Sequence, residues 1–212
     1  IVQCLVGSEM CIRDRLSDVI REDEARVAAV RDAAGEDAEL FIDANCSLDY
    51  FHAVELAGAL SPYHISFFEE PITQNDVLQM AELRRQTGMR VACGQNEAQS
   101  YRFRDMLVAG AVDIVQPNVV ITGGFTQCQK IAALASGFNV GIDNGGAWPF
   151  FNAHLHAGVA NGGLVEWHYS SVEACRLIYD ELPEAKGGWF KMSEAPGLGF
   201  ELNTGRLERY VI

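Results

Sequence analysis

The sequence predicts an α/β fold that forms most of a (β/α) barrel, and three observations support this. Short apolar runs alternate with helical segments at a step of roughly 25 residues, as they do in parallel βαβ units. Six such runs follow one another, which is more than a simple two-layer motif requires. Each run also ends on or near an acidic or amide residue, and in such barrels the catalytic groups lie at the carboxyl ends of the strands.

The first helix and strand are expected between residues 21 and 43. Val27, Val30 and Ala34 recur at helical spacing. Gly35 is a suitable residue to end this helix, because glycine adopts the left-handed conformation that follows many helices. The four residues 40–43 are then expected to form a strand.

The next two units repeat this pattern. Ser47 can cap a helix that leads to a strand at 65–69, because a serine oxygen accepts hydrogen bonds from free amides at a helix start. Asn75 can cap the following helix, which is expected to run to Gly88 and to lead to a strand at 90–95.

Three further units complete the alternation. Ser100 can cap the first helix, Gly123-Gly124 opens the second, and Pro149 is expected to start the last helix. The strands that follow these helices are expected at 112–115, 140–143 and 164–168.

The two ends of the chain differ from this regular part. Residues 1–15 resemble a translated sequencing-adapter read-through, so we expect them to be non-native and exclude them from the fold prediction. The partial barrel is expected at 16–169. Residues 170–212 are rich in glycine and proline turns and are expected to pack toward the barrel or toward a capping domain.

The composition excludes several classes of function. With 49% hydrophobic and 21% charged residues, the 212 residues are typical of one soluble domain. A formal net charge of −13 argues against binding to nucleic acid or to an anionic membrane. No apolar run approaches the roughly 20 residues of a membrane span, and no signal segment opens the chain, so a cytoplasmic protein is expected.

Neither a disulfide framework nor a zinc site is expected. The six cysteines show no CxxC or paired metal spacing and are expected to be free, mostly buried thiols. His154 and His156 are two residues apart on a helix, which places them on different faces.

The polar residues at the strand ends favour magnesium. They are Asp43, Glu69, Gln95, Asn118, Asp143 and Glu166. Strand alternation lets only one of Glu69 and Glu70 share the face of Phe67, and Glu69 has the matching parity. Magnesium prefers a few carboxylate oxygens and leaves positions for substrate, which suits Asp43, Glu69 and an oxygen from the third strand.

A magnesium ion at such a site can hold a carboxylate substrate and stabilise the ene-diolate that forms when a base removes the neighbouring proton. Elimination or reprotonation would follow. Phosphoryl transfer has no support, because no GxxxxGK[ST] loop is present. Gly123-Gly124 could bind an anion through free backbone amides or form an ordinary tight turn.

These residues resemble the enolase superfamily, in particular its mandelate racemase/muconate lactonizing enzyme-like group, which includes acid-sugar dehydratases. The likeness extends from about residue 21 to 212 and rests on the motifs at 41–45 (FIDAN), 68–71 (FEEP), 93–96 (CGQN), 115–118 (VQPN), 123–124 (GG), 165–166 (VE) and 196–199 (PGLG). It implies strands three to eight of a TIM-like (β/α)7β barrel, without the first two strands and the N-terminal capping domain.

The resemblance also implies roles for individual residues. Asp43, Glu69 and Gln95 are implied to be magnesium ligands, and Asn45 is implied to lie beside the metal. Glu166 is implied to contact the substrate or to act as an electrophile. His168 shares the strand parity of Glu166, so it either faces the substrate or is a structural histidine.

Several positions depart from the family pattern. Gln95 stands where a carboxylate is usual and offers only a neutral amide oxygen, so Glu97 is a substitute candidate by strand parity. Asn118 replaces the aspartate of the sixth strand. The histidine of the seventh strand falls near Asp143 or Asn144.

The sequence therefore does not assign the identity of the general base. Asp143 could act as the base only if burial raised its pKa, which the charge of the metal would oppose. The other base of the family, a lysine on the second strand, is expected upstream of this chain or under the adapter-like segment, because no lysine precedes Lys130.

The predicted function is a magnesium-dependent hydro-lyase that dehydrates a sugar acid. A racemase or epimerase on the same site and a non-catalytic relative or inactive fragment are the alternatives. The expected partner is a small carboxylate, and a homo-oligomer is expected for the full-length protein.

Overall fold

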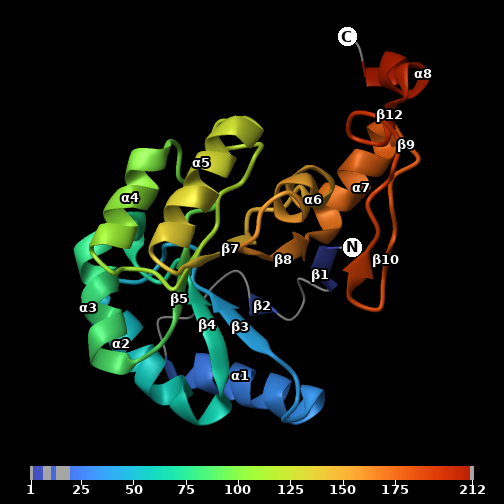
Figure 1. Cartoon of the computed structure of the whole chain (residues 1–212). Coiled ribbons are helices and arrows are strands. Elements are labelled where there is room, and N and C mark those ends of the chain that lie inside the picture. Colours follow the sequence, from blue (N-terminus) through green and yellow to red (C-terminus); the bar gives the residue numbers. More distant parts are fainter. Residues whose placement is uncertain (1, 7–10, 13–19, 211–212) are drawn as a thin grey trace. The chain divides into compact units, whose positions relative to one another are not determined.

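The computed structural model of the chain describes residues 2–6, 11–12 and 20–210, which form two compact units (Figure 1). Unit 1 comprises 1–8, 95–100 and 117–212, and unit 2 comprises 9–94 and 101–116. No helix in the described part of the chain has the length and apolar character of a membrane span.

Unit 2 contains a parallel sheet with the strand order β6-β5-β4-β3-β2. The strands are β2 (Cys11–Ile12), β3 (Leu40–Asp43), β4 (Ile65–Glu69), β5 (Val91–Cys93) and β6 (Ile114–Val115). Asp43 pairs in register with Glu69, and Glu69 pairs with Ala92. Because the strands are parallel, their carboxyl ends meet at one edge of the sheet.

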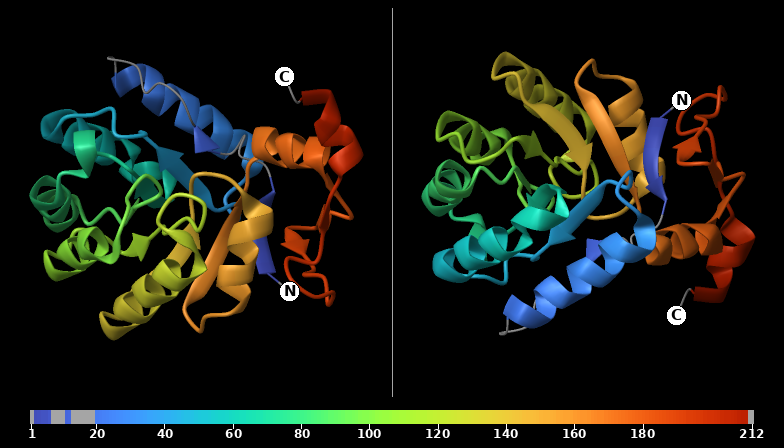
Figure 2. Two further views of the ribbon diagram at one scale, coloured as in Figure 1. Left: turned by 90° about the horizontal axis from the view of Figure 1, so that it is seen from above. Right: turned by 90° about the horizontal axis from the view of Figure 1, so that it is seen from below.

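Four helices of unit 2 lie along the strands, with α1 beside α2 and α2 beside α3 (Figure 2). They are α1 (Ile20–Ala34), α2 (Tyr50–Leu60), α3 (Val77–Thr87) and α4 (Ser100–Val108), the first residue of which belongs to unit 1. Val27, Leu56, Leu83 and Phe103 are buried on these helices, and Phe41 stacks on Phe67 of the neighbouring strand. The apolar positions therefore form the core that the helical periodicity predicts.

Unit 1 contains a mixed sheet with the strand order β10-β11-β1-β8-β7. The strands are β1 (Val2–Val6), β7 (Gly141–Asn144), β8 (Gly162–Trp167), β10 (Ala185–Lys186) and β11 (Trp189–Phe190). Strand β8 pairs in parallel with β1 and β7, whereas β11 pairs antiparallel with β1 and β10. A separate antiparallel pair joins β9 (Tyr179–Asp180) to β12 (Glu201–Leu202).

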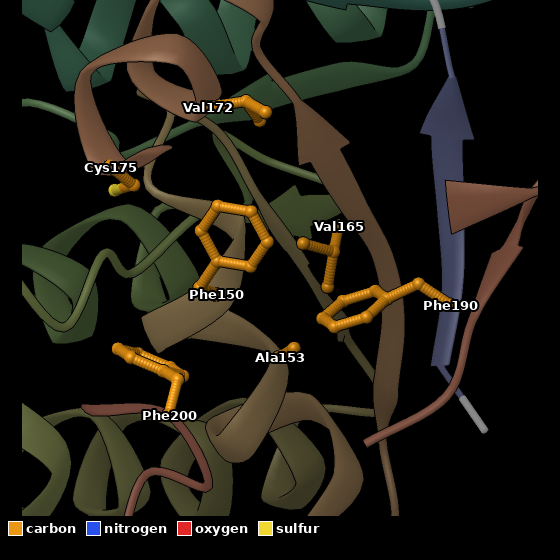
Figure 3. Close-up of a cluster of buried hydrophobic side chains, with 7 residues drawn as sticks. All are labelled: Phe150, Ala153, Val165, Val172, Cys175, Phe190 and Phe200. Atoms are coloured by element: carbon orange, nitrogen blue, oxygen red, sulfur yellow. The ribbon is translucent and has the colours of Figure 1, made fainter. Parts of the chain in front are cut away.

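The helices of unit 1 are α5 (Gly124–Gly137), α6 (Pro149–Ala157), α7 (Tyr169–Ile178) and α8 (Thr204–Leu207). Figure 3 shows a buried cluster in which Phe150 and Ala153 of α6 meet Val165 of β8. Phe190 and Phe200, from the C-terminal segment, complete this cluster together with Val172 and Cys175 of α7. Val172, Cys175, Phe190 and Phe200 of the C-terminal segment therefore pack against β8 and α6 within unit 1.

The N-cap residues of α2 and α3 differ from those expected. Asp49 caps α2 in place of Ser47, because its Oδ1 accepts a hydrogen bond from the backbone N of His52 at 2.9 Å. Asp76 caps α3 in place of Asn75 and accepts from two backbone amides. Asn75 is instead buried and engaged in side-chain hydrogen bonds.

The two ends of the chain also correct the prediction. The helix that starts at Pro149 is not the last one, because α7 follows directly on β8. Residues 2–6 and 11–12 form strands, although the fold prediction excluded residues 1–15 as non-native. The rest of the adapter-like segment lies outside the described residues. It comprises residue 1 and residues 7–10 and 13–15.

Candidate metal and substrate site

Two buried carboxylates lie side by side in unit 2. Asp43 and Glu69 are the last residues of β3 and β4, are paired in register, and are 3% and 8% exposed. The Asp43 Oδ1 accepts a hydrogen bond from the backbone N of Asn45 at 2.7 Å. Two buried carboxylates in this arrangement repel each other, and a divalent cation relieves that repulsion. The donor chemistry of the pair therefore fits magnesium.

Asn45 lies in the turn directly after this pair. Its side chain is exposed and its backbone has a left-handed conformation, with φ +47°. Asparagine tolerates this conformation better than most residues. The turn directs the Asn45 N–H back to Asp43, and the exposed amide is available to a ligand at this strand end.

A third carboxylate next to the pair is fully buried. The Oε1 of Glu70 accepts a hydrogen bond from Asn75 Nδ2 at 3.1 Å, and Asn75 Oδ1 accepts one from the Cys46 thiol at 3.3 Å. Burial, followed by the charges of Glu70 and Asp43, raises the pKa of the Cys46 thiol to about 12. The carboxyl groups of Asp43, Glu69 and Glu70 therefore all lie at the ends of β3 and β4, and carboxylates there would favour a cation.

Gln95 is buried in unit 1, beside the turn 145–148. Its Oε1 lies 3.2 Å from the position that a Cβ would take on Gly146. The predicted strand at 90–95 ends earlier, since β5 stops at Cys93 and residues 95–96 form a turn. Strand parity therefore does not relate Glu97 to Gln95, and that argument for Glu97 is wrong.

Asn118 holds the same turn and is fully buried. Its Nδ2 donates to the backbone oxygens of Gly145 and Gly146, each at 2.9 Å, and more weakly to Ala147 O at 3.3 Å. Its Oδ1 accepts from Val120 N at 3.0 Å. All of the hydrogen-bonding capacity of this amide is directed into protein.

Two more amides complete the support of the turn. Asn152 of α6 donates to Asn118 Oδ1 and to the backbone oxygens of Ala147 and Trp148, each at 3.1 Å. Asn144 of β7 donates to Gly145 O at 2.7 Å, while its Oδ1 is buried without a partner in the described part of the chain. Asn152 was not predicted from the sequence, because a polar residue on a helix gives no signal of this kind.

Glu166 and Asp143 both bind backbone amides of unit 1. Glu166 Oε2 accepts from Ala147 N at 2.6 Å, so this carboxylate touches the same turn as Asn118. Asp143 Oδ1 accepts from Leu164 N at 2.7 Å, where the pairing of β7 with β8 shifts its register. The Asp143 carboxylate thus accepts the Leu164 N–H in place of a backbone carbonyl of the neighbouring strand.

His168 is the N-cap residue of α7. Its Nδ1 accepts a hydrogen bond from Ser171 N at 3.4 Å and lies 2.9 Å from Ser170 Oγ. A ring nitrogen that accepts from a backbone amide is unprotonated, so the proton of the neutral ring is on Nε2. The Nε2 side of the ring is the part that a substrate could contact.

Among the residues that the structure describes, the cysteines and histidines form no zinc arrangement. Cys46, Cys93, Cys128 and Cys175 are free thiols, and three of these four are buried. Within the described residues, no three His, Cys, Asp or Glu side chains converge as a metal site. The predicted magnesium ligands are two carboxylates and the amide of Gln95, so they are not a group of three His, Cys, Asp or Glu side chains.

The predicted site residues therefore fall into two groups. Asp43, Glu69 and Asn45 gather at one sheet edge of unit 2. In unit 1, Gln95, Asn118 and Glu166 all contact the turn 145–148, whereas Asp143 and His168 bind other backbone groups.

The chain is similar in sequence to several known proteins. A family model described as enolase C-terminal domain-like matches residues 6–206. D-gluconate dehydratase of Thermoproteus tenax is 31% identical over 205 residues, which cover 92% of this chain and 40% of that protein. The chain spans between 40% and 54% of the curated relatives it matches.

Several solved structures are similar to this chain in fold. A racemase from Streptomyces coelicolor with bound magnesium has a TM-score of 0.83 and 29% identity, over 91% of this chain and 52% of that one. L-talarate dehydratase from Polaromonas sp. JS666, complexed with Mg and L-glucarate, has a TM-score of 0.83 and 27% identity, over 92% and 53%. These matches confirm the predicted fold class, an α/β fold that corresponds to part of a TIM-like barrel.

Proposed function

Because the chain belongs to the enolase superfamily, in the family described as enolase C-terminal domain-like, we propose that it acts in magnesium-dependent removal of the proton next to a substrate carboxylate. The substrate class we propose is a sugar acid, and the outcome is dehydration. The names of two relatives, D-gluconate dehydratase and L-talarate dehydratase, support this choice. The observation that carries the proposal is the buried, in-register pair of Asp43 and Glu69.

Asp43 and Glu69 would hold the magnesium ion. When bound, the ion supplies positive charge that binds the substrate carboxylate and stabilises the negative charge that develops there during proton removal. Gln95 as a third ligand stays a prediction, and its neutral oxygen would add no charge to the site. Asn45, next to the pair in the chain, is proposed to contact the substrate.

The residues of unit 1 are proposed to bind and position the substrate. Glu166 is proposed as the substrate contact or electrophile, oriented by the Ala147 N–H. Asn118 would act by fixing the turn 145–148, since its amide is fully used there. His168 could reach the substrate only through Nε2, because Nδ1 caps α7. Asp143 is the base candidate in this chain, with one carboxylate oxygen held by Leu164 N.

Two alternatives remain with specific support. Racemisation or epimerisation would use the same carboxylate pair, and a magnesium-bound racemase is among the solved structures that the chain resembles. A non-catalytic role is favoured by Gln95, by Asn118 and by the hydrogen bond that engages Asp143.

Magnesium binding by calorimetry on the full chain tests the proposal. Asp43→Asn and Glu69→Gln should each weaken magnesium affinity by about a hundredfold or more, because each removes one charge from the site. Asp37→Asn and Glu36→Gln, in an exposed turn of unit 2, are matched controls that should bind as the wild type does. Unchanged affinity in Asp43→Asn and Glu69→Gln would refute the ligand assignment.

A substrate screen separates the reactions. Incubating sugar acids in deuterated water with the magnesium-loaded protein should give a keto acid product if the protein dehydrates. Deuterium exchange next to the carboxylate without loss of water would indicate racemisation. If magnesium binds but neither product nor exchange appears, the non-catalytic alternative is correct.

A further inference from the structure

The loops that follow β3 and β4 are tied together along their length. The backbone N of Ala44 donates to Glu69 O at 3.0 Å, and that of Cys46 donates to Glu70 O at 2.8 Å. Farther along, Thr73 donates to Leu48 O through both its backbone N and its hydroxyl. The backbone that follows Asp43 and the backbone that follows Glu69 are therefore hydrogen-bonded to each other beyond the strands.

A chain of side chains crosses this junction inside the protein. The Cys46 thiol donates to Asn75 Oδ1 at 3.3 Å, and Asn75 Nδ2 donates to Glu70 Oε1 at 3.1 Å. Asn75 is 3% exposed and Glu70 is 0% exposed, so water does not compete for the bond between them, whereas the Cys46 thiol is half-buried. An amide is suited to the central position, because it accepts from a thiol and donates to a carboxylate at the same time.

The backbone at these three residues is left-handed. The φ angles are +58° at Cys46, +40° at Glu70 and +50° at Asn75. For most residues other than glycine this conformation is unfavourable, although asparagine tolerates it better, and it persists where the surroundings enforce it. Each of these residues makes a hydrogen bond through its side chain, and the bond between Asn75 and Glu70 is buried, so these bonds provide such an enforcement.

We propose that Asn75 is a positioning residue for the carboxylates of Asp43 and Glu69, acting through Cys46 on one loop and Glu70 on the other. The proposal rests on the proposed function, in which these carboxylates bind magnesium. Asn75 fixes the strand ends in the conformation that keeps the two carboxylates in register. Partners that orient metal ligands in this way typically change metal affinity ten- to a hundredfold.

The test is magnesium calorimetry on full-chain variants, together with thermal unfolding without magnesium. Asn75→Gly removes the amide but leaves a residue that adopts positive φ without strain. Magnesium affinity should fall about tenfold or more. Gln74→Gly is the matched control, since Gln74 precedes Asn75, also has positive φ at +59°, and is exposed. It should bind magnesium as the wild type does.

A second pair of variants keeps the test decisive if Asn75→Gly does not fold. Cys46→Ala removes the donor to Asn75 and should weaken magnesium binding, whereas Cys46→Ser retains a donor and should restore it. Wild-type affinity in Asn75→Gly, or equal affinity in Cys46→Ala and Cys46→Ser, would show that the network is only structural. If Asp43→Asn and Glu69→Gln also bind magnesium normally, the proposed function itself is refuted, which is a distinguishable outcome.

Discussion

Gln95 is the predicted third magnesium ligand, and a substitution at this position tests that prediction. Replacing its amide by a carboxylate in Gln95→Glu adds one negative charge, and ligand charge is a main determinant of affinity for hard cations. We expect magnesium affinity, measured by calorimetry, to rise about tenfold. We also expect lower stability without magnesium, because position 95 is 3% exposed and a buried charge is costly. Unchanged or weaker magnesium binding would mean that residue 95 is not a ligand.

His156 is a second residue with a measurable consequence. It lies buried on α6, and neither ring nitrogen has a hydrogen-bond partner among the described residues. Burial lowers its pKa from 6.5 to about 4, and a backbone interaction with Gly163 opposes the shift only in part. Between these two values the unfolded chain binds a proton that the folded chain does not.

The free energy of unfolding should therefore depend on pH through His156. The contribution is complete above about pH 6.5 and is lost as the pH falls toward 4, for a total of about 3 kcal/mol. Urea unfolding at a series of pH values measures this slope. His156→Leu should flatten it, whereas His154→Gln on the same helix should leave it unchanged. An equal slope in His156→Leu would show that other groups cause it.

At the scale of elements, the turn between β7 and α6 depends on Gly146. Its φ is +73°, and a Cβ there would lie 3.2 Å from both Gln95 Oε1 and Asn118 Nδ2. Gly197 provides an unusually close control, because it has the same φ of +73° with nothing within 4 Å of its Cβ position. The two glycines differ only in what surrounds them.

The alanine variants of these glycines should separate strain from packing. Gly197→Ala should cost about 1 to 2 kcal/mol, from left-handed backbone strain alone. Gly146→Ala should cost at least about 1 kcal/mol more, because the added methyl group displaces two buried amides that support the turn. Denaturant unfolding of both variants measures the difference. Equal costs would mean that the turn adjusts freely and does not constrain Gln95.

The elements also show what a sequence can predict. Strands β3 and β4 match the predicted ranges, because their apolar runs end at Asp43 and Glu69 and mark the boundary by themselves. The support of the turn 145–148 was not predictable, because it depends on Asn152, 34 positions after Asn118 in the chain. Caps were predicted one or two residues early, since Ser47 and Asn75 are as suitable by type as Asp49 and Asp76, and only the fold selects between them.

At the scale of the whole chain, the net charge of −13 affects how magnesium data must be interpreted. Repulsion among the negative charges opposes folding, and any salt reduces it by screening. Added magnesium chloride would therefore raise the melting temperature even without a specific site. A specific site adds a further term, of about 2.7 kcal/mol when magnesium is present at 100 times its Kd.

Comparing salts at equal ionic strength separates the two effects. For the wild-type chain, magnesium chloride should raise the melting temperature by several degrees more than sodium chloride, because a binding free energy of this size shifts the midpoint by that much. For the double variant with Asp43→Asn and Glu69→Gln, the two salts should give the same rise, since only screening remains. Asp37→Asn combined with Glu36→Gln removes the same number of charges from an exposed turn and should keep the difference between the salts. If the double variant at Asp43 and Glu69 kept that difference, magnesium would be bound elsewhere in the chain.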